Sequence, residues 1–180
     1  VCGFLAHGRW GVCAWIGLVG GFGGVAIALA WMGNVFVSDP CRSVEPMMQI
    51  RAAEFGQAWM DEILSKKYDE TTPVGGVPAC TICTASASFG SESESRSTYD
   101  DVDDYHDSCG SPVALVNSIG NGVGGFNGYS MEVCVRYDGN YDGTADSNTN
   151  AKLVTVNIYL PSGAGLGGAP ITFNSYRGNF

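Results

Sequence analysis

A short acidic segment in the C-terminal third of the chain offers the clearest pattern of metal-ligand residue types. Asp138, Asn140 and Asp142 alternate along the chain, a glycine follows them, and Asp146 adds a further carboxylate. The pattern matches the first half of an EF-hand calcium loop, although Thr149 stands where that loop has its bidentate glutamate. The segment therefore predicts either a calcium loop connecting two strands or an Asx-rich hairpin turn, which uses the same residues. We predict no cofactor for the protein unless this loop binds calcium.

The cysteines suggest a disulfide framework. Seven are present: Cys2, Cys13, Cys41, Cys80, Cys83, Cys109 and Cys134. The five from Cys41 onward can pair if this part of the chain lies in an oxidising compartment. We expect Cys109 to pair with Cys80 or Cys83, closing a loop whose entropy is worth roughly 3 kcal/mol. The alternative is a four-ligand zinc site of Cys80, Cys83, His106 and Cys109, whose types and spacings suit tetrahedral coordination.

Residues 99–107 contain five aspartates and one histidine. A tethered metallohydrolase could use them, with a site made of Asp100, Asp101, Asp103, Asp104 and His106. No nucleophile motif or basic phosphate clamp accompanies the cluster, and aspartate is a frequent turn and cap residue. We therefore predict a structured acidic turn, no catalytic residues, and a protein that is not an enzyme.

Composition narrows the class of protein further. Of the 180 residues, 45% are hydrophobic and only 15% charged, so the chain should fold around a core rather than stay disordered. The formal net charge of −9 repels nucleic acid and anionic lipid headgroups. A nucleic-acid partner is therefore excluded from the prediction.

The N-terminal region is apolar. No charged residue occurs between Arg9 and Asp39, and the stretch from Ala14 to Val37 would span about 36 Å as a helix, against about 30 Å for a hydrocarbon core. We predict a transmembrane segment within residues 1–38, with a short cytoplasmic N-terminus and a translocated C-terminal body. A cleaved signal peptide or a buried glycine-rich core segment is the alternative.

An amphipathic helix should follow within residues 39–70. From Ser43 to Tyr68 the apolar residues recur with helical spacing, and Glu45-Pro46 fits the first turn. The predicted buried stripe consists of Met48, Ala52, Phe55, Trp59 and Ile63.

The rest of the chain divides into an irregular connection and a sheet. Residues 71–112 are rich in proline, glycine, serine and cysteine, which is typical of a connection without regular structure. Residues 113–180 contain alternating apolar segments at 129–137, 153–160 and 171–176, and a fourth strand is possible at 113–119. The fold class predicted is α+β, with the helix covering the apolar face of a small antiparallel sheet.

Two stretches resemble a known family. The runs from Arg42 to Leu64 and from Ser95 to His106 look like those of minor pilins of the mannose-sensitive haemagglutinin (MSHA) pilus system, the MshD type. The resemblance implies a type IV pilin-like fold, in which one long N-terminal helix is first transmembrane and then amphipathic. It also implies a structural role in pilus biogenesis, without a small-molecule substrate. The expected partners are other pilin subunits, pilus assembly proteins and the inner membrane.

The resemblance places the protein in the bacterial inner membrane as a single-pass subunit, with its C-terminal domain in the periplasm or in an extracellular pilus. Two other functions remain open. A type II secretion pseudopilin would share the anchor, the helix and the sheet. A membrane-tethered calcium- or ligand-binding module would not polymerise at all.

Overall fold

The computed structural model describes residues 40–161 and 168–180. The chain divides into two compact units, Val1–Val44 and Glu45–Phe180. The transmembrane segment predicted within residues 1–38 lies outside the described residues.

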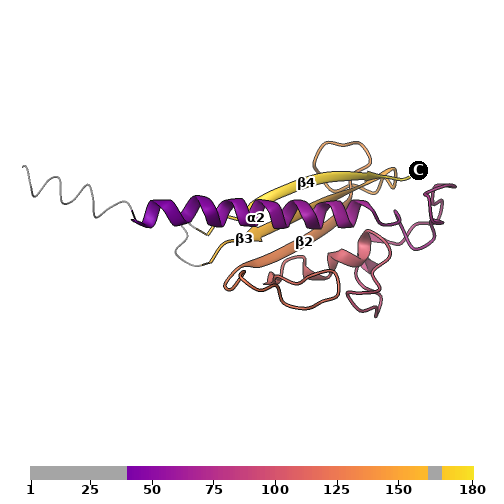
Figure 1. Ribbon diagram of the computed structural model, residues 1–180. Coiled ribbons are helices and arrows are strands. Elements are labelled where there is room, and N and C mark those ends of the chain that lie inside the picture. The colour runs from indigo at the N-terminus through magenta and orange to yellow at the C-terminus, as the bar shows by residue number, and fades with distance from the viewer. Residues whose placement is uncertain (1–39, 162–167) are drawn as a thin grey trace, which may run out of the picture. The chain divides into compact units, whose positions relative to one another are not determined.

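The first described element is the helix α2, Pro40–Leu64 (Figure 1). Proline suits the first helical position, because its missing N–H would have no partner within the helix there. The helix thus begins before the predicted Ser43, and Pro46 lies inside it rather than in its first turn. It also ends earlier than predicted, at Leu64 instead of Tyr68.

The predicted apolar stripe of α2 faces the core. Ala52 and Ile63 are fully buried and Trp59 nearly so, while Met48 and Phe55 are half-buried against the same cluster. The Trp59 indole N–H donates to the backbone oxygen of Val116, 3.2 Å away, so the ring is buried without losing its hydrogen bond.

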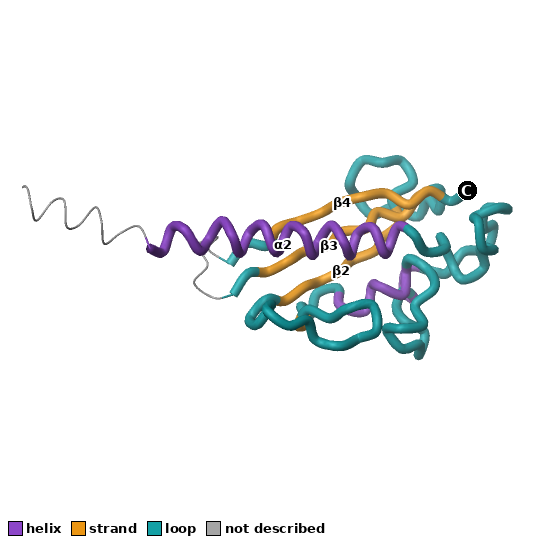
Figure 2. The backbone as a smooth tube through the Cα atoms, viewed as in Figure 1, coloured by secondary structure: helices purple, strands orange, loops and turns teal. Residues whose placement is uncertain are grey.

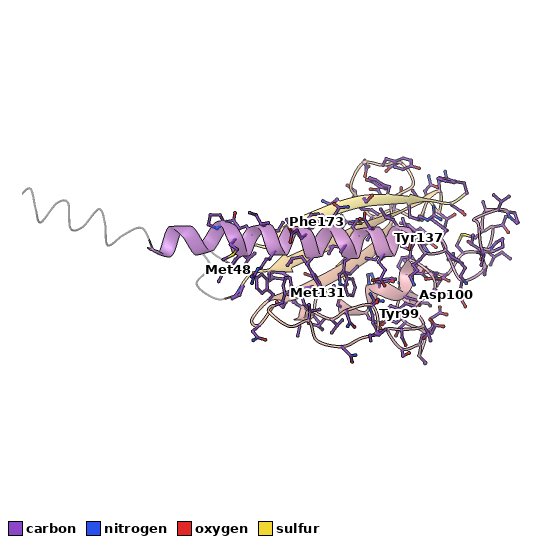
Figure 3. All side chains as sticks on the ribbon, in the orientation of Figure 1. Met48, Tyr99, Asp100, Met131, Tyr137 and Phe173 are labelled. Atoms are coloured by element: carbon purple, nitrogen blue, oxygen red, sulfur yellow. A yellow bond between two sulfur atoms is a disulfide. The ribbon has the colours of Figure 1, made fainter. Side chains whose placement is uncertain are left out.

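Four antiparallel strands form a sheet in the order β1-β2-β3-β4. Their bounds are β1 Val113–Ala114, β2 Ser130–Tyr137, β3 Ala151–Tyr159 and β4 Ile171–Gly178. Figure 1 shows α2 lying along β3, with β2 and β4 to either side of it. The inward pairs Met131–Ile158, Val133–Val156 and Val135–Val154 supply the apolar face that the helix covers. The helix packs against β4 at Gly56, where an added Cβ atom would collide with the ring of Phe173, a residue labelled in Figure 3.

Most of the outer edge of β2 is paired by side chains rather than by a strand. The predicted strand at 113–119 is only the two-residue β1, which reaches no further along β2 than Ser130 and Met131. Beyond it, the backbone N–H of Val133 donates to Ser108 Oγ (2.8 Å) and that of Val135 to His106 Nδ1 (3.0 Å). Both acceptors belong to the short 3-10 helix η2, Asp103–Ser108, which therefore shields this edge.

The connection between α2 and β1 contains little regular structure, as Figure 2 shows by its loop colour. In it the described helices are η1, Ser86–Ser88, and η2. Some of its backbone N–H groups donate to backbone oxygens in turns, as Thr72 does to Asp69, and others to carboxylates, as Thr84 does to Asp69 Oδ2 and Ser91 to Asp107 Oδ1. Aspartate thus takes the part of a partner strand in this connection.

The predicted pilin-like fold class is wrong for the part of the chain described. Within residues 40–161 and 168–180 there is no helix with the length and apolar character needed to cross a membrane. The long helix α2 carries the charged residues Arg51, Glu54, Asp61 and Glu62. These charges make it too polar to cross a hydrocarbon core. What remains of the prediction is an amphipathic helix on an antiparallel sheet.

The helix–sheet contact predicts a sharp contrast between two isoleucines of α2. Ile63 is fully buried, whereas Ile50 is 59% exposed. Changing Ile63→Ala should lower the free energy of unfolding by roughly 2–5 kcal/mol, because it leaves a cavity in the core. The matched change Ile50→Ala should alter it by no more than about 0.5 kcal/mol. Denaturant unfolding of both variants measures the difference, and equal effects would contradict the observed packing.

Candidate functional site

The first candidate site is the loop that follows β2. Asp138 is fully buried at its start. Its Oδ1 accepts the backbone N–H of Asp142 (3.1 Å), and its Oδ2 accepts the N–H of Gly143 (2.8 Å) and the Tyr176 hydroxyl (2.6 Å). The carboxylate therefore faces into the turn and organises its backbone.

The other predicted calcium ligands are used in the same way. Asp146 Oδ1 accepts the N–H groups of Asn148 (2.7 Å) and Gly139 (3.3 Å). The Asn140 side chain spans the turn and donates to Asp142 Oδ2 at 2.9 Å. This arrangement favours the Asx-turn alternative, because the oxygens that a cation would need already accept protein donors. Calcium binding by the loop stays a prediction.

The cysteine pairing differs from the one expected. The structure contains disulfides Cys80–Cys83 and Cys109–Cys134, so Cys109 is joined to neither Cys80 nor Cys83. Sequence reasoning failed here because it passed over Cys134, which β2 brings beside the end of η2. The zinc alternative is also wrong, because Cys80, Cys83 and Cys109 are all in disulfides and so have no thiolate to offer a metal.

A side chain from the far end of the sheet holds the Cys80–Cys83 turn. Asn179 Oδ1 accepts the backbone N–H of Cys80 at 2.8 Å. The Asn179 amide donates to the backbone oxygens of Cys80 (3.0 Å) and Thr149 (3.1 Å). One amide thus fastens two loops to the end of β4.

Two aspartates of residues 99–107 accept hydrogen bonds from the backbone of their own segment. Asp101 Oδ1 accepts the N–H groups of Asp103 and Asp104, while Asp104 Oδ2 accepts those of Asp100 and Asp101. Asp100 itself forms an ion pair with Lys67 at 3.0 Å. Among the described residues, the groups of three ligand types within mutual reach include none of these aspartates and are built around disulfide cysteines. The segment matches the predicted structured acidic turn.

Sequence reasoning missed the most unusual group of the molecule, Lys152 of β3. Its side chain is fully buried, and its ammonium contacts two equally sheltered carboxylates, those of Asp69 (3.3 Å) and Asp103. It also donates to the backbone oxygen of Tyr68 at 2.7 Å. A buried lysine of this kind is rare unless it is paired.

Aromatic rings enclose the Lys152 ammonium on its remaining sides. The nitrogen lies 4.6 Å from the ring centre of Tyr68, 5.0 Å from that of Phe89 and 5.7 Å from that of Tyr137. Ring faces attract a cation and at the same time exclude water from it. The surroundings are therefore dry but electrostatically favourable to a positive charge.

The pKa values of Asp69 and Asp101 are shifted in opposite directions. Burial by itself raises the pKa of Asp69, but the Thr84 N–H and the charge of Lys152 outweigh it and hold that pKa below its ordinary value of 3.8. For Asp101, burial and the neighbouring charges of Asp103 and Asp104 raise the pKa to about 8. At neutral pH the Asp69 carboxyl is thus ionised and the Asp101 carboxyl is protonated.

The strand register could have revealed Lys152. Val154, Val156 and Ile158 alternate on the buried face of β3, and the same two-residue period places residue 152 on that face. A charged residue at an inward position signals a partner elsewhere in the fold, although the sequence does not say which.

A second feature that the sequence did not reveal is a cavity of about 320 Å³ beside Arg96. The Arg96 guanidinium lies 4.3 Å from the Trp59 ring centre and 4.8 Å from that of Tyr105. Its Nη2 also pairs with Glu62 Oε1 at 2.7 Å. Arg96 therefore joins the 95–106 segment to α2, and Tyr99 and Met131 line the same cavity. Figure 3 labels both of these residues.

The chain was compared with protein-family models, curated proteins and solved structures. No protein-family model, no curated protein and no solved structure matches the chain.

The disulfides predict a simple tryptic map under non-reducing conditions. Cys80 and Cys83 lie in the tryptic peptide 68–96, and Cys109 and Cys134 lie together in 97–136. Each disulfide should therefore be internal to one peptide. Mass spectrometry of the digest before and after reduction measures this, and a disulfide joining 68–96 to 97–136 would restore the pairing first expected.

The buried Asp138 predicts a loss of stability in acid. Burial raises its pKa, but the Tyr176 hydroxyl and the loop N–H groups outweigh burial and set the pKa below the ordinary 3.8. A depressed pKa stabilises the fold above the unfolded value, and this stabilisation is lost as the pH falls through the folded value. The stability advantage of the wild type over Asp138→Asn should therefore shrink below about pH 4.

Denaturant unfolding of both proteins at several pH values measures this advantage, and a difference that stays constant down to about pH 2 would contradict it. Repeating the neutral measurement with calcium and with a chelator tests the loop for metal. A midpoint that rises with calcium in the wild type but not in Asp138→Asn would establish the calcium alternative.

Proposed function

We propose that the chain is a non-enzymatic structural subunit of a type IV pilus-class assembly, related to the minor pilins of the MSHA system. In this role it acts by docking with other pilin subunits and assembly proteins. The unit Glu45–Phe180 would be its extracytoplasmic head.

One observation carries this proposal. The two stretches that resemble minor pilins, 42–64 and 95–106, are separate in the sequence but pack on each other. Arg96 pairs with Glu62 and lies over Trp59, and the Tyr105 hydroxyl donates to Glu62 Oε1 at 2.9 Å. The resemblance therefore covers a contiguous piece of structure, which is what a shared structural role would preserve.

The two disulfides support an extracytoplasmic position. Disulfides persist in oxidising compartments and are rare in the cytosol of most organisms. The Cys109–Cys134 bond joins the end of η2 to β2, so it reinforces the shielded edge of the sheet. A head exposed to an oxidising environment gains stability from such a bond without a larger core.

The surface proposed for docking is the exposed face at the start of the unit's helix. Met47 is 51% exposed and Ile50 is 59% exposed, although both are large apolar residues in α2. Apolar side chains on one stretch of a helix suit packing against a helix of a neighbouring subunit. The acidic charge of the whole chain would then select which neighbours are accepted.

Cysteine crosslinking in the source cells tests the proposal. The variant I50C places a thiol on the proposed docking surface, and I119C places one on a loop with almost the same exposure, 61% against 59%. We expect I50C to form crosslinks to pilin-class proteins identified by mass spectrometry, and I119C to give only the background of the unmodified chain.

The pattern of crosslinks also separates the rival functions. Products between I50C and subunits of a secretion system would favour a pseudopilin. Equal, background-level products from I50C and I119C would overturn the docking role and favour a module that does not polymerise.

A further inference from the structure

Lys152 and Asp103 bring an amine and a carboxyl group into direct contact where water does not reach them. The exposed fractions of the two side chains are 0% and 3%. Lys152 lies on the central strand β3, and Asp103 begins η2, so two distant segments meet at this point. We propose that Lys152 Nζ and Asp103 Cγ become joined by an intramolecular amide bond, which the folded chain forms by itself with loss of one water.

Asp103 is a better electrophile than the other carboxylate at the site. Asp69 accepts hydrogen bonds from the Thr84 N–H (2.8 Å), the Thr71 hydroxyl (2.9 Å) and the Thr71 N–H (3.2 Å), all of which favour its ionised form. Among the described residues, the Asp103 carboxylate receives a hydrogen bond from Lys152 alone. It can therefore become neutral without leaving another donor unpaired.

The reaction balances without an added reagent. Proton transfer from the Lys152 ammonium to the Asp103 carboxylate leaves a neutral amine beside a neutral carboxylic acid. The amine nitrogen attacks Cγ of Asp103 and forms the C–N bond, while the protonated Asp101 gives its proton to the departing hydroxyl. The C–O bond breaks, water leaves, and the proton lost by nitrogen returns to Asp101. An ammonium and a carboxylate have become an amide and water.

Asp101 lies in the same turn as Asp103, two residues before it, and supplies the acid in the proposed exchange. Its Oδ1 accepts the N–H groups of Asp103 and Asp104 at 2.9 and 3.2 Å, which fixes the carboxyl in the same buried turn. Burial and the charge of Asp103 raise the pKa of Asp101, while the charge of Lys152 lowers it. The resulting pKa of about 8 keeps Asp101 protonated at neutral pH. A carboxylic acid held neutral in this way can both donate and accept a proton.

Burial favours the product as well as the encounter. Two groups held in contact react with an effective concentration of about 10⁵ M or more when they are well oriented. The Lys152–Asp103 ion pair carries a large desolvation cost without water, and conversion to an amide removes the charges of these two partners. The Asp69 carboxylate stays charged and keeps the hydrogen bonds from the Thr84 N–H and the Thr71 hydroxyl. The one N–H that remains on nitrogen still has acceptors, Tyr68 O and Asp69 Oδ2.

The aromatic walls then protect the bond. Tyr68, Phe89 and Tyr137 surround the nitrogen, so the water needed for hydrolysis is excluded. Figure 3 shows Tyr137 near the C-terminal end of α2, at the same end as Asp100. The bond would thus tie β3 to η2 at one end of the sheet, whether or not the chain joins a filament.

Mass spectrometry of the reduced, denatured full chain tests the proposal. We expect a mass lower by one water than the sequence requires, and trypsin should fail to cleave after Lys152. The digest should contain a branched product of peptides 97–136 and 137–177. An unmodified mass with free 137–152 would overturn the proposal, and a branch to 68–96 would assign the bond to Asp69 instead.

Variants separate the reaction from folding. Asp101→Asn keeps the shape of the side chain but removes its exchangeable acid, so the bond should be lost or form much more slowly while circular dichroism stays native-like. The control Asp100→Asn changes a half-exposed aspartate of the same segment, paired with Lys67, and should keep the bond. A full yield of bond in Asp101→Asn would remove Asp101 from the step. The wild-type mass decides the bond itself even if a variant fails to fold.

Discussion

The buried Lys152 of β3 determines how the connection between α2 and β1 packs on the sheet. An ammonium without water requires partners on every side, and they come from four segments: Asp69 and the Tyr68 oxygen after α2, Phe89 after η1, Asp103 at the start of η2, and Tyr137 at the end of β2. While Lys152 is charged, withdrawal of the carboxylate segments would leave the buried ammonium unpaired, at a cost of roughly 3–5 kcal/mol. The connection between α2 and β1 is therefore ordered by one strand residue, although it contains little regular structure of its own.

A second constraint is the outer edge of β2, which has a partner strand only at Ser130 and Met131. An exposed row of N–H groups invites pairing with another chain. Here Ser108 and His106 occupy those donors, and the Cys109–Cys134 bond keeps them in position. At that edge the N–H groups of Val133 and Val135 are therefore not free to pair with a strand of another chain. In the proposed function, α2 rather than this edge contacts the neighbouring subunits.

The sequence predicted the local periodicity and missed the long-range pairing. The stripe from Met48 to Ile63 and the alternation in β2 and β3 could be recognised because each depends on neighbours a few residues apart. Neither the Cys109–Cys134 bond nor the contacts of Lys152 has such a signature, since both join segments that only the fold brings together. Asp138 and Asp146 illustrate an intermediate case, because the same residues at the same spacing suit a cation or the turn's own backbone, and only their orientation separates the two.

Asn179 has a consequence for the order of events during synthesis. It lies 99 residues after Cys80, yet it supplies the acceptor for the Cys80 N–H. Cys80 and Cys83 are three residues apart, so they can be oxidised as soon as that stretch emerges. If the chain were exported from its N-terminal side, the Cys80–Cys83 disulfide could therefore form early. Its hydrogen bond from Cys80 to Asn179 could form only after β4 had paired with β3.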